Sequence, residues 1–218
     1  MKIPLMVKVY ARLRKGWKRL NKDAQQQVKQ YLLSQCRTDG YLNAGGQVDA
    51  YYTQFGKVLE AVMSPVKAIW LPKKPLVVKE SMGRNTIYGR FFAFLSGDTQ
   101  PIPKTSDIKH KITTAVCCVL AMQHQTGEAL DRTLIGWLKA RQDETGGFHA
   151  SEIAPIPDLL STAVALFTLR LVGERPKSAA RFIEAHWLDL GSFAPTLLDE
   201  YSDVEYLFYG LLALGSDE

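Results

Sequence analysis

The stretch WLKARQDETGGFHASEIAPIPDLLSTAVALFTL, residues 137–169, decides how the rest of the chain is interpreted. Its first part is amphipathic, and Gly146 and Gly147 suit the left-handed backbone conformation that commonly closes a helix. Phe148 is the apolar residue expected to fold back onto that helix. Asp158 stands directly before the final apolar run, where the N-cap of a helix belongs. The stretch therefore predicts a helix, a tight loop and a second helix.

The same order of residues occurs three times in the chain. Each copy has an aromatic residue shortly after a glycine and, eight or ten positions later, an aspartate that opens an apolar segment. The three aromatic–aspartate pairs are Tyr41 with Asp49, Phe148 with Asp158, and Phe193 with Asp203. Three copies of a unit of roughly 40 residues indicate an array of helical hairpins, in which each hairpin buries its apolar face against its neighbours.

In the first two copies a glutamine, Gln35 or Gln142, precedes the glycine–aromatic turn, and a threonine follows the aspartate within the helix start. This combination resembles the repeat shared by terpenoid cyclases and protein prenyltransferase β-subunits. The resemblance covers about residues 28–62 and 134–214, with a degenerate copy at 80–96. It implies an all-α fold, an α/α toroid-like array of helical hairpins. Closed rings of that family have longer chains, so we expect an open or abbreviated ring, or one that another subunit completes.

Length and composition limit the class of protein. A chain of 218 residues with 46% hydrophobic residues fits one domain with a substantial core. Its three cysteines make no disulfide framework, which favours a reducing compartment. No apolar run approaches the roughly 20 residues needed to cross a bilayer, and residues 3–7 are too short for the apolar region of a signal peptide. We therefore expect a cytoplasmic protein, either free or peripheral at a membrane.

Residues 1–22 form a basic segment with eight basic residues and no acidic one, whereas the rest of the chain carries 19 basic and 22 acidic residues. Apolar residues recur in this segment every three or four positions, which predicts an amphipathic helix over residues 3–21. The helix is either an outer helix with a solvated charged face or a docking element for anionic lipid or an acidic partner. Nucleic-acid binding is not expected, because no aromatic-interleaved basic surface or recognition motif follows.

Residues 23–218 are expected to form a single toroid-like domain with a Pro- and Lys-rich insertion at about 64–80. Because Pro65, Pro72 and Pro75 exclude a regular helix there, the insertion is either a surface loop or a flap. Nine or ten helices are expected in all, with Asn21 or Asp23 capping the second. The predicted helices include about residues 23–35, 49–62, 85–97, 105–125 and 129–142.

The resemblance places the Asp-capped helices in an inner layer, with their N-termini around one rim. Helix N-termini attract anions such as a diphosphate, although the aspartate caps oppose this. The inner faces would form an aromatic funnel suited to an isoprenoid tail, with Arg84 and Arg90 gripping a diphosphate. The alternative is that these aromatic residues only fill a core and the arginines meet solvent. The candidate ligand-binding residues are Tyr52, Phe55, Arg84, Tyr88, Arg90, Phe91, Ser161, Thr162, Tyr206 and Tyr209.

The catalytic groups of that family do not carry over to this chain. The position of its zinc-binding histidine is occupied here by Tyr52, Ser161 or Tyr206. The Asp-x-Cys zinc pair and the Asp-x-Asp-Asp motif of cyclases are absent from the sequence. Asp199, Glu200 and Asp203 have the spacing of the magnesium motif Asp-Asp-xx-Asp, with glutamate at its second position. Magnesium is therefore the cofactor that the spacing allows, although Asp203 is also a helix cap in the repeat pattern.

Two functional hypotheses follow. The first is a prenyltransferase- or cyclase-like protein that binds an isoprenoid-type ligand in the funnel and acts in prenyl transfer or cyclisation. The second is a catalytically degenerate toroid that acts as an interaction or accessory subunit, whose open edge is covered by a protein partner or a second copy. The first predicts a deep aromatic cavity, and the second predicts a filled centre with an exposed apolar edge.

Overall fold

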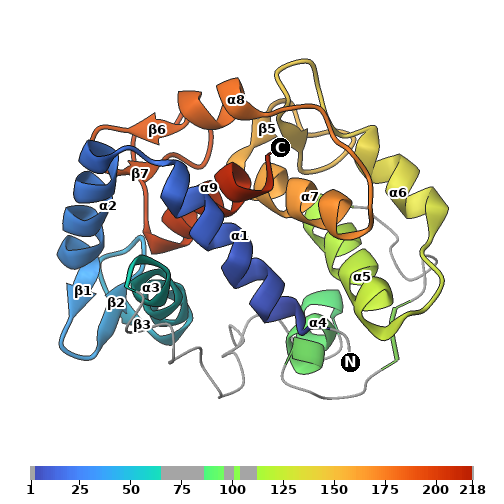
Figure 1. The fold of residues 1–218 in the computed structure, drawn as a ribbon, viewed down its shortest axis with the longest axis horizontal. Helices are drawn as coiled ribbons and strands as arrows, with labels where there is room; N and C mark the ends of the chain where they lie inside the picture. Colours follow the sequence, from blue (N-terminus) through green and yellow to red (C-terminus); the bar gives the residue numbers. More distant parts are fainter. Residues whose placement is uncertain (1–2, 65–85, 96–100, 104–111, 218) are drawn as a thin grey trace.

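The computed structural model describes residues 3–64, 86–95, 101–103 and 112–217 (Figure 1). In these ranges nine helices are joined by short strands that form three small antiparallel sheets. The helices are α1 (Leu5–Arg19), α2 (Lys22–Gln35), α3 (Ala50–Met63), α4 (Ile87–Leu95), α5 (Thr113–Thr126), α6 (Arg132–Lys139), α7 (Leu159–Leu171), α8 (Ala180–Ala185) and α9 (Val204–Ser216). The strands are β1 (Cys36–Arg37), β2 (Gly40–Leu42), β3 (Val48–Asp49), β4 (Phe148–His149), β5 (Pro157–Asp158), β6 (Trp187–Leu188) and β7 (Ser192–Phe193). None of the helices described is both long and apolar enough to cross a membrane.

Four helices form a row in which α5 packs against α7, α7 against α9, and α9 against α3 (Figure 1). Backbone hydrogen bonds connect the N-terminal ends of neighbouring helices in this row. The backbone N–H of Thr113 donates to the carbonyl of Ala150 at 2.8 Å, and that of Leu159 donates to Pro195 at 2.9 Å. Each of these carbonyls belongs to the loop that leads into the next helix of the row. The starts of these helices therefore lie along one edge of the row.

The three predicted aspartate caps are confirmed. The carboxylate of Asp49 accepts from the backbone N–H of Tyr51 at 2.7 Å, Asp158 accepts from Ser161 at 2.7 Å, and Asp203 accepts from Glu205 at 2.9 Å. Each carboxylate satisfies an N–H group that has no partner within its helix. The aspartates thus fix where α3, α7 and α9 begin.

The loops before these helices repeat a common arrangement. Strand pairing sets Tyr41 opposite Asp49 and Phe148 opposite Asp158. The aromatic ring of the first copy, Tyr41, lies over Gly56, and that of the third copy, Phe193, lies over Gly210. A Cβ atom on either glycine would come within 2.3 Å or 2.1 Å of the ring. Both glycines stand seven residues after their aspartate cap, so the repeat includes a glycine under the ring in these two copies.

Helix α1 crosses α9 with the two backbones in direct contact. A Cβ atom on Gly16 would lie 2.0 Å from the carbonyl oxygen of Leu211, and one on Gly215 would lie 1.8 Å from that of Arg12. The guanidinium group of Arg19 donates to carbonyl groups at the end of α9. The helix predicted over residues 3–21 is therefore confirmed, and part of its basic face serves an internal contact.

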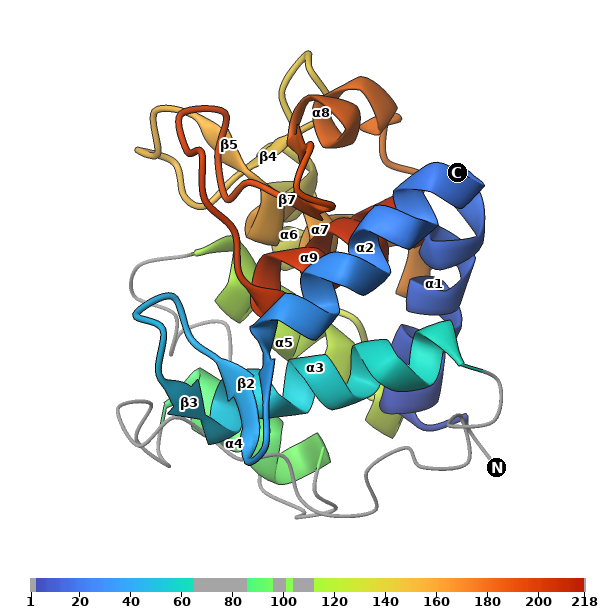
Figure 2. The same ribbon diagram turned by 90° about the vertical axis from the view of Figure 1, so that its left-hand side faces the viewer.

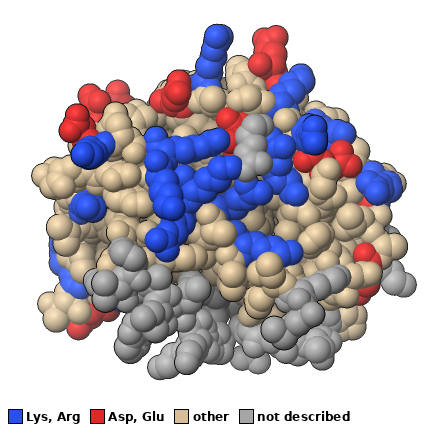
Figure 3. All heavy atoms as spheres, viewed as in Figure 1, with Lys and Arg blue, Asp and Glu red and all other residues tan. Residues whose placement is uncertain are grey.

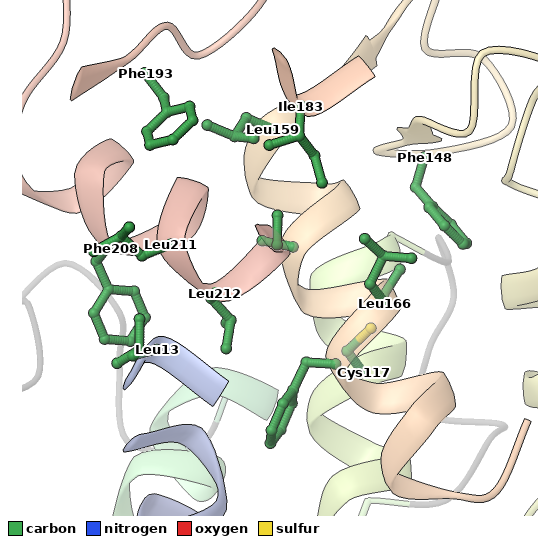
Figure 4. Packing of buried hydrophobic residues seen from close by; sticks show 14 of the residues in the cluster. Leu13, Cys117, Phe148, Leu159, Leu166, Ile183, Phe193, Phe208, Leu211 and Leu212 are labelled. Carbon is green, nitrogen blue, oxygen red and sulfur yellow. The ribbon is translucent and has the colours of Figure 1, made fainter. Parts of the chain in front are cut away.

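Buried side chains of these helices form one continuous cluster (Figure 4). Figure 4 labels Leu13 of α1, Leu211 and Leu212 of α9, Leu166 of α7 and Cys117 of α5 among its members, and each is at most 4% exposed. Burial on this scale is the main source of stability, at about 25 cal/mol per Å² of apolar surface. The core centres on α7 and α9 and extends to α1, α3 and α5 and to α2, α6 and α8.

Several sequence predictions require correction. The helix expected at 129–142 is shorter, Arg132–Lys139, because Ala140 is its C-cap and the chain then turns into the hairpin. Gly146 has the expected left-handed conformation, with φ at 90°, but it lies in that turn and does not close the helix. Asn21, and not Asp23, caps α2. The mostly helical prediction is confirmed, whereas the short strands were not expected and the described helices do not show a toroid.

Some predictions fall on parts of the chain outside the described residues. These are most of the insertion at about 64–80, the cap at 105–107 and the ligand-binding assignment of Arg84. The helix expected over residues 105–125 begins only at Thr113, because Ile112 has an extended backbone and is its N-cap. The degenerate copy at 80–96 is described only from residue 86 to residue 95, where it forms α4.

Candidate functional site

The described helices α3, α4, α5, α7 and α9 surround a cavity of about 590 Å³, hereafter the central cavity. This volume falls within the roughly 300–1,000 Å³ of typical small-molecule sites. Aromatic side chains make up much of its wall: Tyr51, Phe55, Tyr88, Phe91, Phe92, Phe167, Tyr206, Phe208 and Tyr209. These helices therefore line a partly open space whose wall is mainly apolar and aromatic.

The central cavity has two distinguishable ends. At one end it meets Leu5, Met6 and Val9 of α1. At the other, the N-terminal end, it meets Ala150, Asp158, Pro195 and Thr196, which stand in or next to the loops before α7 and α9. In Figure 2, α1 lies on the opposite side of the molecule from these loops. The cavity thus extends from α1 toward the capped helix starts.

Six of the ten predicted ligand-binding residues line the central cavity. They are Phe55, Tyr88, Phe91, Ser161, Tyr206 and Tyr209. They come from α3, α4, α7 and α9, so the structure brings together residues that are far apart in the sequence. Their positions agree with the inner-face assignment made from the repeats.

The other four do not line the central cavity in the described structure. The Thr162 hydroxyl accepts from the backbone N–H of Phe148 at 2.8 Å and donates to the carbonyl of Asp158 at 2.7 Å, which makes it a structural part of the hairpin. Tyr52 is only 9% exposed, and Arg90 stands on α4 outside the lining. Arg84 lies outside the described residues.

The α3–α9 side of the central cavity is an aromatic chain. The rings of Tyr51 and Phe55 meet edge to face with centroids 5.0 Å apart, as do those of Phe55 and Phe208. Phe208 and Tyr209 continue this geometry at 5.5 Å. Edge-to-face contacts are favourable because they bring a positive ring edge to a negative ring face. This side of the wall is therefore held in place by its own packing.

One acidic side chain of the wall is deeply buried. Glu205 is 9% exposed, and its carboxylate accepts a hydrogen bond from the hydroxyl of Tyr51 at 2.8 Å. Asp158 contributes a second carboxylate at the N-terminal end. Among the described residues that line the cavity there is no lysine and no arginine. The described lining is thus mainly apolar with two carboxyl groups, and of the two arginines expected to bind a diphosphate Arg90 is not part of it and Arg84 lies outside the described residues.

Burial keeps the tyrosine hydroxyls and the thiols of the wall protonated. Desolvation raises the pKa values of Tyr51, Tyr206 and Tyr209 well above their ordinary value. It also raises the pKa of the Cys117 thiol to about 12, and that of Cys118 further. Since the thiolate is the nucleophilic form, neither cysteine is activated at neutral pH. The tyrosines serve as neutral hydrogen-bonding groups.

The magnesium arrangement is not found. Asp203 is engaged as the cap of α9, and the carboxylate of Asp199 accepts from the backbone N–H and the hydroxyl of Thr196 at 3.0 Å and 2.6 Å. Glu200 is exposed to solvent. No group of three or more metal-ligating side chains suitable for a metal ion occurs in the described part of the chain. The spacing of these acids reflects loop and helix capping.

Several lining residues were missed by the sequence analysis. They include Glu205 and Tyr51, the α5 residues Thr114, Cys117 and Cys118, and the α1 residues at the far end of the cavity. Glu205 had a usable signal, because a glutamate inside a helix that is otherwise apolar is seldom buried without a reason. The contribution of α1 had none, since it depends on long-range packing.

No protein-family model, curated protein or solved structure matches this chain at a significant level. The functional assignment therefore depends on the geometry of the central cavity and on the chemistry of its lining.

Proposed function

We propose that this protein binds an apolar small molecule of isoprenoid type in the central cavity. The observation that carries the proposal is the 590 Å³ cavity with its aromatic lining. The cavity is only partly enclosed, so water can wet its aromatic wall, and a hydrocarbon that displaces this water buries apolar surface. A bound hydrocarbon is held mainly by this burial of its surface.

The sequence repeat supports a toroid-like arrangement of helices around the cavity. As in the terpenoid cyclase and prenyltransferase family that the sequence resembles, α3, α7 and α9 would be inner helices of an abbreviated toroid, with α2, α6 and α8 outside. The aspartate caps and the ring-bearing hairpins support this relationship. The proposal is limited to binding, because the zinc and acidic groups of that family do not occur at the matching positions.

Native mass spectrometry with farnesol, a neutral isoprenoid alcohol, tests the proposal. We expect one bound molecule per chain, and we expect Val164→Trp to abolish binding because Val164 of α7 lines the central cavity. Val7→Trp is the matched control, since Val7 is also helical but is 42% exposed and outside the lining. Circular dichroism would establish that both variants fold. Absence of binding to the wild type, or equal binding by both variants, would refute the proposal.

A second candidate function is that of an interaction subunit, and one observation favours it. The loops before α7 and α9 expose large apolar side chains: Ile153 is 92% exposed, Leu198 83% and Leu197 58%. Exposed apolar residues that gather on one side of a protein commonly mark an interface. Size-exclusion chromatography with light scattering tests for self-association. If the protein is an interaction subunit that binds a second copy of itself, the wild type should form oligomers and the Leu198→Ser variant should be monomeric.

The basic face of α1 supports a membrane contact that is compatible with either function. Lysine and arginine side chains gather over α1 on the face shown in Figure 3. Such a face is attracted to anionic lipid by about 1 kcal/mol per basic residue near the surface. Co-sedimentation with phosphatidylserine vesicles, compared with neutral vesicles, would detect this contact. A Lys18→Glu change at an exposed position should weaken it.

A further inference from the structure

Charge is distributed unevenly along the axis of the central cavity. Residues 143–169 contain four acidic residues, and residues 182–217 contain seven, while neither segment contains a lysine or an arginine. These two segments supply α9, most of α7 and most of the loops before these helices, and Arg141 and Arg170 lie just outside the first segment. On the face shown in Figure 3 one group of basic residues gathers over α1, and in Figure 2 α1 lies on the opposite side of the molecule from these loops. The described residues that line this end of the cavity thus include the carboxyl groups of Asp158 and Glu205 and no basic side chain.

The buried end of this acidic region lies inside the wall. Glu205 stands in the first turn of α9, with its carboxylate 2.8 Å from the Tyr51 hydroxyl, and both residues line the central cavity. The rings of Tyr206 and Tyr209, which also line it, offer faces that attract cations. A carboxylate beside aromatic faces in an apolar space is a setting that favours a positively charged group over a negative one.

We propose that the central cavity selects an apolar amine, with its hydrocarbon tail between the helices and its protonated amino group at Glu205. This inference rests on the proposed function, because it specifies the head of the ligand that the cavity holds. The ammonium group would donate to the carboxylate and lie against the neighbouring tyrosine rings. A diphosphate head would face Glu205 and Asp158, and the described lining offers it no cationic side chain.

The test compares three ligands that share a farnesyl tail and differ in their heads: farnesylamine, farnesol and farnesyl diphosphate. Dissociation constants are measured at pH 7 by isothermal titration calorimetry, below the concentration at which the ligands aggregate. We expect the amine to bind at least roughly tenfold more tightly than the alcohol, and the diphosphate to bind most weakly, in line with the strength of charge-assisted hydrogen bonds.

Glu205→Gln removes the charge while it nearly preserves the shape of the side chain. We expect it to reduce the affinity for farnesylamine to about that for farnesol, with farnesol binding changed by less than roughly twofold. Glu200→Gln is the matched control, because Glu200 is exposed and outside the lining, and it should leave all three affinities unchanged. If Glu205→Gln does not fold, the affinity of the wild type for farnesyltrimethylammonium, whose positive charge is permanent, is measured instead. We expect the wild type to bind this ligand more tightly than farnesol.

The outcomes separate the two proposals. If none of these ligands binds, the proposed function fails. If farnesol binds as tightly as the amine and the quaternary ammonium, or if the diphosphate binds most tightly, the cavity function stands and the inference about the head group is overturned. Equal loss of amine and alcohol binding in Glu205→Gln would also overturn it, because the glutamate would then only shape the wall.

Discussion

Replacing Gly215 by alanine tests how closely α1 and α9 pack. The added Cβ atom would lie 1.8 Å from the carbonyl oxygen of Arg12, and an ordinary contact begins near 3.4 Å. The obstacle is backbone of another helix, which cannot move aside as the end of a flexible side chain can. The two helices would have to separate by about 1.6 Å along this contact.

The expected loss of stability follows from two opposing effects. Overpacking of this kind costs up to about 3 kcal/mol, and separation of the helices also weakens the packing around Leu13. Alanine in a helix gains about 1 kcal/mol over glycine. The net destabilisation is then about 2 kcal/mol, which corresponds to a decrease in Tm of roughly 4–8 °C for a protein of this size.

Gly136→Ala is the matched control for this change. Gly136 also lies within a helix, α6, but a Cβ atom there would meet no atom within 4 Å. We expect this variant to be unchanged or stabilised by up to about 1 kcal/mol. Differential scanning calorimetry of both variants decides the matter. A Gly215→Ala protein as stable as the wild type would refute the direct backbone contact between α1 and α9.

Three further predictions concern single side chains. Asp203→Ala should cost about 1 kcal/mol in urea unfolding, because it removes the cap of α9, and Asp203→Asn should restore most of the loss. Burial lowers the pKa of His186 below its ordinary 6.5, so the unfolded chain binds the proton more readily. The contribution of neutral His186 to the free energy of unfolding is therefore complete above about pH 6.5 and decreases as the pH falls below that value. The free energy of unfolding of His186→Gln, measured in urea, should consequently decrease less over this pH range than that of the wild type. In the native protein, the partly exposed Cys36 should react with a thiol reagent well before the buried Cys117, whose pKa is raised to about 12; comparable rates under native conditions would contradict the enclosed position of Cys117.

The parts of the fold that the sequence predicted are those with local signals. An aspartate before an apolar run is enough to place the start of α3, α7 or α9, because the cap is a bond between neighbours in the chain. The glycine–aromatic turns were recognisable for the same reason. By contrast, the contact of Gly16 with α9 joins residues about 200 positions apart in the chain, and no periodicity within α1 specifies it.

The candidate site was predicted in part, for a related reason. The resemblance to the cyclase and prenyltransferase repeat implied that Phe55, Tyr206 and Tyr209 lie on inner faces, and they line the central cavity. The same reasoning put Thr162 there, but its hydroxyl bonds the hairpin, since a threonine four residues after a cap can reach back to the carbonyl of the cap residue. The residues contributed by α1 and α5 became apparent only from the packing.

The head group that we propose for the ligand illustrates how side chains can reverse an expectation based on the backbone. Helix starts that gather at one end of a cavity suggest an anion site, because each carries about half a positive charge. Here α3, α7 and α9 are each capped by an aspartate, whose full negative charge outweighs that half charge when ionised. Glu205 adds a further carboxylate one turn inside the wall. Of these groups Asp158 and Glu205 line the cavity, and their carboxyl groups are the reason for which we propose an amine, and not a phosphate, as the head of the ligand.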